Sequence, residues 1–191
     1  METPSNTVHR FETLMCSIKW YVMRDLKRSN TLYPAYKVLR TMHLEVFTPM
    51  QWKVTNKKGI MIREQVPFLP DLLFVHASKE ILNPFVDRIP TLQYRYVRGG
   101  RYKEGMIVSE TAMNKFIYAV TSSPQAEYFT PSELTPKNIG SHIRIVGGPL
   151  NGYTGHLLNI RKSGKERLLV EIPNLLTAAI EIEPEYIQVI K

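Results

Sequence analysis

Residues 140–157 read GSHIRIVGGPLNGYTGHL, and this stretch decides the fold of the C-terminal part of the chain. Ile143 and Ile145 alternate with Arg144, which predicts a short strand with one apolar face. The turn residues that follow or flank it are Gly140, Gly147, Gly148, Pro149, Gly152 and Gly155. Closely spaced glycines indicate positive φ at a turn, or two backbones too close for a side chain. The stretch therefore predicts a strand, a tight corner and a second strand that closes one end of a small barrel.

A phosphate-binding loop is the competing interpretation of the glycine-rich run at residues 148–152. Such a loop continues into Gly-Lys-Ser/Thr and opens a helix, because the lysine and the helix N-terminus hold the phosphates. Neither feature follows here. The sequence favours turn chemistry over phosphate binding.

The bulk composition describes a folded chain of 191 residues, long enough for one ordinary domain or two small ones. Hydrophobic residues make up 43% and charged residues 22%, which is typical of a globular protein. No apolar run is long enough to span a bilayer. The polar N-terminus lacks a signal-peptide core, and a single cysteine, Cys16, allows no internal disulfide. We expect a cytoplasmic protein without a membrane segment.

The formal net charge of +8 is unevenly placed along the chain. Residues 1–122 carry 18 Lys/Arg against 10 Asp/Glu, whereas residues 123–191 carry 7 against 7. The surplus therefore belongs to the N-terminal part. It fits nucleic acid or an acidic partner surface, and it fits a solvated exterior equally well.

The periodicity along the chain predicts two domains behind a mobile tail at residues 1–16. Over residues 17–122 strand-like runs alternate with helices that begin near Pro34, at Asn83-Pro84 and after Ser109. This order predicts an α+β fold, a sandwich of helices against a mainly antiparallel sheet. Residues 123–137, rich in Pro, Ser and Thr, are expected to be a linker. Residues 138–191 hold about five short strands, which fits a small closed SH3-like β-barrel.

The stretch at residues 140–157 resembles the KOW motif, through the turn residues above and Arg144. Three segments of the first domain, Trp20-Tyr21-Val22, VFTP at residues 46–49 and LPDLLFV at residues 69–75, resemble the N-terminal domain of NusG-type elongation factors. The sequence segments at residues 34–39 (PAYKVL), 74–76 (FVH) and 92–96 (LQYRY) are most similar to the specialised UpxY-like branch. Members of that branch are associated with antitermination in surface (capsular) polysaccharide operons of Bacteroides-like bacteria.

The resemblance implies a monomeric transcription factor that performs no reaction and needs no cofactor. Its first domain docks on the clamp helices of the largest RNA polymerase subunit and can reach upstream or non-template DNA. Its KOW barrel recruits a ribosomal protein, the termination factor Rho or another factor. Carried over by position, the RNA polymerase-binding patch comprises Leu69, Pro70, Leu72, Trp20, Tyr21 and Phe47.

The patch departs from the family pattern, which has an aromatic, Pro-Gly and Tyr where this chain has Leu69, Pro70-Asp71 and Leu72. Aromatic anchors commonly dominate binding energy, so the docking energy is expected to be distributed differently. On pattern alone Leu69 and Leu72 fit either an exposed patch or the core, and residues such as Trp20 and Phe47 are more often core. Candidate nucleic-acid contacts are Lys27, Arg28, Lys57 and Lys58, although basic tips are often only solvated.

Catalytic chemistry is not predicted. The five histidines, at positions 9, 43, 76, 142 and 156, show no metal-ligand spacing with one another or with Cys16. No Gly-x-Ser-x-Gly nucleophile motif is present. We expect no enzyme, no metal and no cofactor. A ribosomal or free RNA-binding KOW protein is the alternative, and the neutral charge balance of the barrel argues against it.

Overall fold

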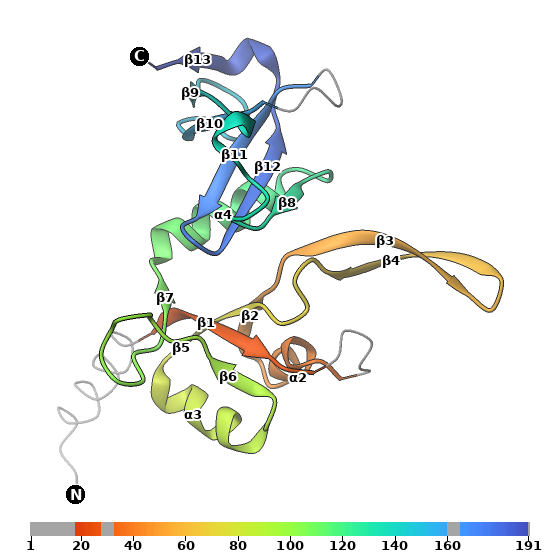
Figure 1. Cartoon of the computed structure of the whole chain (residues 1–191), viewed down its shortest axis with the longest axis vertical. Coiled ribbons are helices and arrows are strands. Elements are labelled where there is room, and N and C mark those ends of the chain that lie inside the picture. The colour runs from red at the N-terminus through yellow and green to blue at the C-terminus, as the bar shows by residue number, and fades with distance from the viewer. Residues whose placement is uncertain (1–17, 28–32, 160–164, 191) are drawn as a thin grey trace, which may run out of the picture. The chain divides into compact units, whose positions relative to one another are not determined.

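The structure is a computed structural model that describes residues 18–27, 33–159 and 165–190. The predicted tail at residues 1–16 and the predicted contact Arg28 lie outside the described residues, as does the side chain of Lys57. The chain divides into two compact units, with the division between Glu110 and Thr111. Figure 1 labels the helices and strands of both.

The first unit is built on an antiparallel sheet with β1 at its centre. Its elements are β1 (Lys19–Asp25), α2 (Ala35–Thr41), β2 (Glu45–Phe47), β3 (Met50–Lys57), β4 (Ile60–Pro67), β5 (Leu73–Ala77), α3 (Lys79–Arg88), β6 (Leu92–Tyr94) and β7 (Ile107–Val108). The strand order is β2-β5-β1-β6, and β7 pairs with the start of β1. Tyr21 lies opposite Val75, and Met23 lies opposite Tyr94. The predicted α+β class with a mainly antiparallel sheet is confirmed.

One face of this sheet carries the core of the first unit, because alternate residues of a strand point the same way. Tyr21 and Met23 of β1 share this face with Val75 of β5. Helix α2 covers it with Ala35 and Leu39, both fully buried, and α3 covers it with Leu82. Both helices therefore lie on the same face of the sheet.

The two helices differ in how well their starts could be predicted. Helix α2 begins directly after Pro34, as predicted, since proline needs no hydrogen-bond acceptor at this position. The prediction that the next helix begins at Asn83-Pro84 is wrong. Helix α3 begins at Lys79, where the Ser78 side chain accepts a hydrogen bond from the backbone N–H of Ile81 at 3.4 Å. Pro84 lies inside the helix, at the expense of one backbone hydrogen bond.

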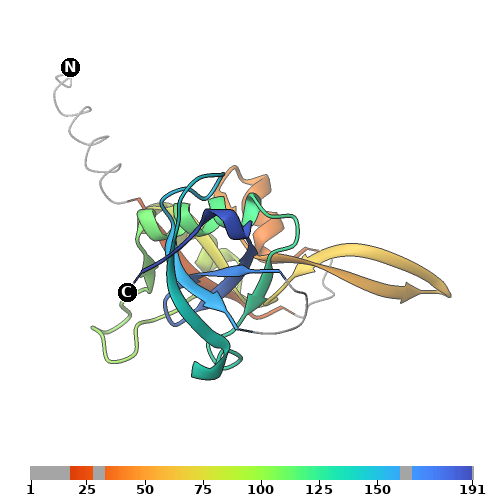
Figure 2. The same cartoon turned by 90° about the horizontal axis from the view of Figure 1, so that it is seen from above.

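Strands β3 and β4 form a separate two-stranded ribbon, in register from Met50↔Pro67 to Lys57↔Ile60. Lys58 and Gly59 make the turn, both with positive φ, which confirms the predicted hairpin tip. In both Figure 1 and Figure 2 the ribbon extends away from the other strands of the first unit. Such a ribbon has no second layer of its own to cover either face.

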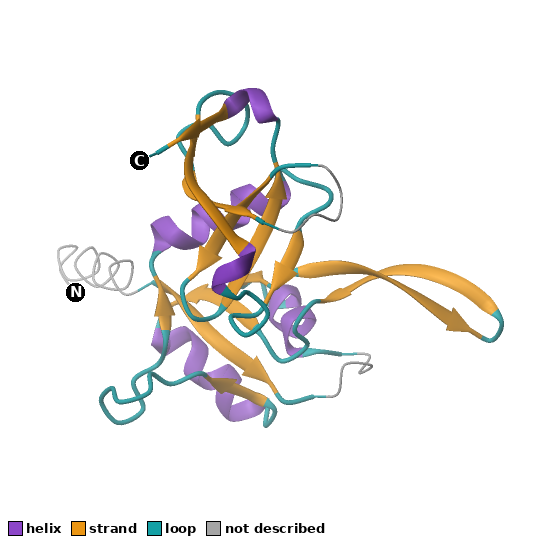
Figure 3. Ribbon diagram, turned by 45° about the horizontal axis from the view of Figure 1, so that its top comes forward, coloured by secondary structure: helices purple, strands orange, loops and turns teal. Residues whose placement is uncertain are grey.

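The second unit contains a six-stranded antiparallel sheet and an α-helix; Figure 3 colours strands orange and helices purple. Its elements are α4 (Glu110–Thr121), β8 (Glu127–Phe129), a 3-10 turn (Pro136–Asn138), β9 (Ile139–Ile145), β10 (Thr154–Leu158), β11 (Arg167–Ile172), β12 (Leu176–Glu181), a 3-10 turn (Pro184–Tyr186) and β13 (Ile187–Val189). The strand order is β13-β9-β10-β11-β12-β8. Ile143, Ile145, Leu168 and Ile180 are buried.

The prediction of a closed barrel is corrected, because this sheet is open in the part of the chain that the structure describes. Strands β13 and β8 lie at its two edges, and no ladder joins them there. Closure requires edge strands that pair with each other, and both edge strands are three residues long. Strand β13 follows directly on a 3-10 turn, which leaves it little length for a second partner.

The segment expected to be a linker, residues 123–137, contains a strand. Residues Glu127–Phe129 form β8 and pair with Thr177, Ala178 and Ala179 of β12. Helix α4, which the sequence placed with the first domain, falls almost entirely on the second unit's side of the division. Its start directly after Ser109 agrees with the predicted start.

Candidate functional site

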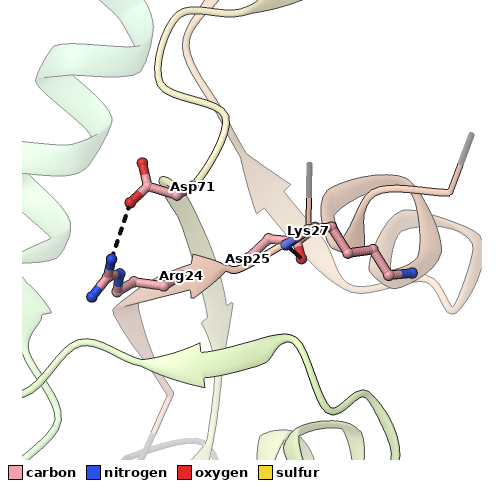
Figure 4. Close-up of polar contacts among 4 residues, drawn as sticks. All are labelled: Arg24, Asp25, Lys27 and Asp71. Carbon is pink, nitrogen blue, oxygen red and sulfur yellow. Dashed lines mark hydrogen bonds and ion pairs between the residues drawn. The ribbon is translucent and has the colours of Figure 1, made fainter. Parts of the chain in front are cut away.

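The C-terminal end of β1 contacts the predicted docking loop, residues 69–72, through Arg24 and Asp25. Figure 4 shows Arg24 pointing toward Asp71 of that loop, and their side chains form a 3.5 Å ion pair. The backbone N–H of Asp25 also donates to the carbonyl oxygen of Asp71 at 3.3 Å. Lys27 lies two residues beyond, with its amine donating to the carbonyl oxygen of Tyr33 at 3.0 Å. The loop and the basic end of β1 are therefore held together.

Asp25 is the buried group that organises this corner. Its side chain is 3% exposed, and one carboxylate oxygen accepts the backbone N–H of Ala35 at 2.6 Å, at the start of α2. The other oxygen accepts the backbone N–H of Lys27 at 3.1 Å. A buried carboxylate needs such partners to offset its lost hydration. Asp25 thus fixes both ends of the chain segment between β1 and α2.

The predicted docking residues do not form one exposed patch. Trp20 and Leu72 are each 1% exposed and Tyr21 is 8% exposed, so the inclusion of these three as surface contacts is corrected. Trp20 stacks on His76 with ring centroids 4.7 Å apart, and Tyr21 packs edge-on against Tyr94. Burial raises the pKa of the Tyr21 hydroxyl, and the negative charge of Glu80 raises it further. Trp20 and Tyr21 are consecutive in β1, where residues 20–23 are all buried, so side chains on both faces of this strand are covered. Leu72 directly precedes the buried strand β5.

The other three docking residues keep some exposure. Phe47 and Leu69 are half-buried and Pro70 is exposed. Leu69 and Pro70 stand in the loop before β5, where the Leu72 backbone N–H donates to the carbonyl oxygen of Leu69 at 3.1 Å. The Thr48 hydroxyl donates to the carbonyl oxygen of Leu72 at 2.9 Å, which ties this loop to the end of β2. The accessible part of the predicted patch is thus small and centred on Pro70.

The β3–β4 ribbon is a surface that the sequence reading missed. Trp52, Val54 and Met61 share one face by register and are 52%, 56% and 66% exposed. On the same face the Arg63 guanidinium lies 4.6 Å from the Trp52 ring centroid, a cation–π contact. Lys58 at the tip is exposed. We call Trp52, Val54, Met61 and Arg63 the ribbon face.

A sequence signal for the ribbon face does exist. Residues 50–67 place apolar side chains on both faces of the hairpin, with Ile60 and Ile62 opposite the ribbon face. A strand pair that buries one face alternates apolar with polar residues instead. The mixed pattern therefore pointed to a ribbon that is not packed as a core hairpin.

The glycine corner of the second unit has the geometry predicted for it. Gly147, Gly148 and Gly152 have φ values of 107°, 64° and 84°. A Cβ on Gly147 or Gly148 would come within 2.9 Å of the Tyr186 ring, so this ring lies flat against the corner. Gly155 has no positive φ, but a Cβ there would lie 2.5 Å from the carbonyl oxygen of Leu169. Both predicted uses of glycine, positive φ and close backbone approach, are confirmed.

The remaining KOW residues lie around this corner. Gly140 on β9 faces Leu157 on β10, where a Cβ would lie 3.1 Å from the Leu157 carbonyl oxygen. Arg144 is exposed on β9, and Pro149 is exposed in the turn. The Asn151 side chain accepts the backbone N–H of Gly147 at 2.8 Å and closes the turn.

A cavity of about 330 Å³ lies beside the glycine corner. Its lining includes Ile145, Pro149, Leu150, Ile182, Tyr186 and Lys165. Lys165 is ion-paired with Glu181, which also lines the cavity. The walls are thus mainly apolar, with the Lys165–Glu181 pair and Glu183 as charged groups, a composition common in ligand and peptide pockets. We call this cavity the corner pocket.

A second cavity in this unit, of about 480 Å³, is lined by α4, β10, β11 and β12. Tyr153 lines it, donating its hydroxyl to the carbonyl oxygen of Lys115 at 3.0 Å. Burial raises the pKa of Tyr153, and the nearby Tyr118 adds to the rise. His156 also lines this cavity.

The described residues contain no group of three or more His, Cys, Asp or Glu side chains placed to hold a metal ion. Among the same residues, no helix is both long enough and apolar enough to cross a membrane. No protein-family model matches this chain. No curated protein matches it significantly either.

Proposed function

We propose that this chain is a NusG-like transcription elongation or antitermination factor of the UpxY-like kind, acting on surface (capsular) polysaccharide operons. It binds the clamp helices of RNA polymerase through the first unit and recruits a second factor through the KOW unit. It acts in the cytoplasm as a monomer, holds upstream or non-template DNA near the basic first unit, and catalyses no reaction.

The observation that carries the proposal is the glycine corner. The KOW resemblance rests on glycine and proline residues, which also occur in ordinary turns. It gains support where each glycine is required by a specific feature of the backbone geometry. Gly147 and Gly148 combine positive φ with contact to the Tyr186 ring, and Gly155 lets β10 approach β11. A generic hairpin turn needs the first property but not the other two.

The ribbon face supports contact with nucleic acid. Base stacking on an exposed aromatic ring contributes roughly 1–3 kcal/mol per base and tolerates any sequence. Trp52 offers such a ring, and Arg63 and Lys58 supply positive charge beside it. We assign the DNA contact to the ribbon face and its tip, with Lys57 at the tip by sequence, and to a lesser degree to Lys27, whose amine already has a partner.

The corner pocket is the recruiting surface that we assign to the KOW unit. Its apolar walls suit one or two apolar side chains of a protein partner, and the Lys165–Glu181 pair offers polar contacts. A ribosomal protein, Rho or another factor would meet these requirements.

Retention on immobilised bacterial RNA polymerase tests the class. The wild-type chain is expected to be retained, and Leu69→Asp is expected to weaken retention at least tenfold, because it places a charge in the half-buried docking loop. Ile81→Asp on α3 is the control, since Ile81 is 45% exposed and outside the predicted patch. Circular dichroism confirms that both variants are folded.

The outcomes separate the parts of the proposal. Equal retention of the wild type and Leu69→Asp would refute the docking loop, and no retention of the wild type would refute the class. Salt-dependent RNA binding without polymerase would support the alternative, a ribosomal or free RNA-binding KOW protein. Run-off transcription through a terminator on candidate leader templates then tests antitermination.

A further inference from the structure

Two histidines that are 14 positions apart in the chain face each other in the second unit. His142 on β9 is the cross-strand partner of His156 on β10. Their ring centroids are 5.0 Å apart, with an angle of 35° between the ring planes. Both side chains are exposed, so neither ring is held there by burial in a core.

The tautomer of His156 is set by a backbone contact. Its Nδ1 atom lies 3.2 Å from the carbonyl oxygen of Gly140. Because a carbonyl oxygen can only accept, Nδ1 carries the proton in this contact and Nε2 of the neutral ring keeps a free lone pair. Metal-binding histidines characteristically donate their other ring nitrogen to a carbonyl or carboxylate in this way, which fixes the ring and raises its basicity.

The surrounding backbone holds the pair in place. Strand β9 is paired with β13 on its other side, and β10 is paired with β11. The β9–β10 register shifts between His156 and Leu158, and such irregularities re-aim side chains near functional sites. His156 also lines the cavity of about 480 Å³, which gives a hydrated ion access to its ring.

The ligand set selects the kind of ion. Neutral imidazole suits zinc, copper and nickel, whereas calcium and magnesium need oxygen ligands and carboxylates. Arg144 lies two residues from His142 on the same face of β9, and its positive charge opposes any divalent cation, so the affinity must come from the bonds to imidazole nitrogen. We propose that His142 and His156 chelate one divalent transition-metal ion, with Nε2 of His156 and a ring nitrogen of His142 as ligands and water in the other positions. This site is independent of the proposed function.

Zinc titration of the full chain, free of any added histidine tag, tests the proposal. Isothermal titration calorimetry with zinc chloride at neutral pH should resolve a site that holds one ion per chain. The single variants His142→Gln and His156→Gln should each weaken this site at least tenfold, since either one breaks the chelate. The double variant should bind zinc no more tightly than either single variant, which keeps one imidazole as a monodentate ligand. His43→Asn is the control, because His43 is exposed, stands in the first unit and has a positive φ that asparagine tolerates.

Imidazole nitrogen NMR supplies an independent readout. Zinc should shift Nε2 of His156 while Nδ1 stays protonated, and removal of the zinc with a chelator should reverse the shift. The proposal is overturned if either single variant binds zinc as tightly as the wild type. It is also overturned if one ion binds per two chains, or if His43→Asn loses affinity to the same extent.

Discussion

The substitution Gly155→Ala probes the closest backbone approach in the second unit. The new methyl group would lie 2.5 Å from the carbonyl oxygen of Leu169, whereas ordinary contact begins at 3.4 Å, so β10 and β11 must separate by about 0.9 Å. The Leu168 side chain, 3.0 Å from the same methyl position, limits any other movement. Overpacking of this kind lowers the free energy of unfolding by about 1–3 kcal/mol. Because the obstructing atom belongs to the backbone and cannot rotate away, we expect a loss of about 2–3 kcal/mol.

Differential scanning calorimetry of the full chain measures this cost. For a unit of this size, about 2 kcal/mol lowers the melting temperature of its transition by roughly 8 °C or more. Amide exchange across β10 and β11 should accelerate at the same time. Gly152→Asn is the matched control: no atom of the described residues lies within 4 Å of its Cβ position, and asparagine tolerates its φ of +84°. If Gly155→Ala melts within about 2 °C of the wild type, the close approach of β10 to β11 is refuted.

Three other predictions concern Asp25, Tyr128 and the tryptophans. Asp25→Ala removes the acceptor of two backbone N–H groups, so it should lower the free energy of unfolding, measured in urea, by about 2–4 kcal/mol. Asp71→Ala breaks only an exposed 3.5 Å ion pair and should lower it by less than about 1 kcal/mol. Equal losses in the two variants would contradict the role of Asp25 as a buried hydrogen-bond acceptor. Burial raises the pKa of Tyr128 to about 12, so above pH about 10 the native state keeps a proton that the unfolded state loses. The free energy of unfolding should therefore fall as pH rises from about 10 to about 12, and should not change from this cause below pH about 10. Ultraviolet titration of tyrosinate in the wild type and in Tyr128→Phe checks this, and ionisation of Tyr128 near pH about 10 would disprove it. Trp52 is half exposed and Trp20 is 1% exposed. The fluorescence of Trp52→Phe, which comes from the buried Trp20, should be quenched poorly by acrylamide, and that of Trp20→Phe, which comes from Trp52, should be quenched well. Similar quenching in both variants would rule out the exposed ribbon face.

The candidate site shows where reasoning from a pattern succeeds and where it stops. The docking patch was carried over by position from a resemblance, and position says nothing about which way a strand residue points. Trp20 and Leu72 proved buried, while Pro70 is exposed. Trp52, which no motif covered, is more accessible than either buried residue. Surface assignment in a strand depends on what covers each face, and that is a tertiary property.

The closed barrel illustrates a second limit. Short strands with turn signals at regular spacing predicted about five strands over residues 138–191, where β9 to β13 lie, but not β8, which lies in the segment expected to be a linker. Whether such strands close is decided by the pairing of the two edges, here three-residue strands at residues 127–129 and 187–189. Edge pairing joins segments about 60 residues apart, beyond the reach of local periodicity.

By itself the sequence determined the features whose physical cause is local. Glycine at positions 147 and 152 adopts the positive φ of these turns without steric cost, and Pro34 starts α2 because it lacks a backbone donor. Tertiary structure alone decided which contacts form between distant segments. His142 and His156 showed no metal-ligand spacing along the chain, yet strand register brings their rings 5.0 Å apart. Local backbone preference can be read from neighbouring residues, whereas register depends on how whole strands pair and which faces they bury.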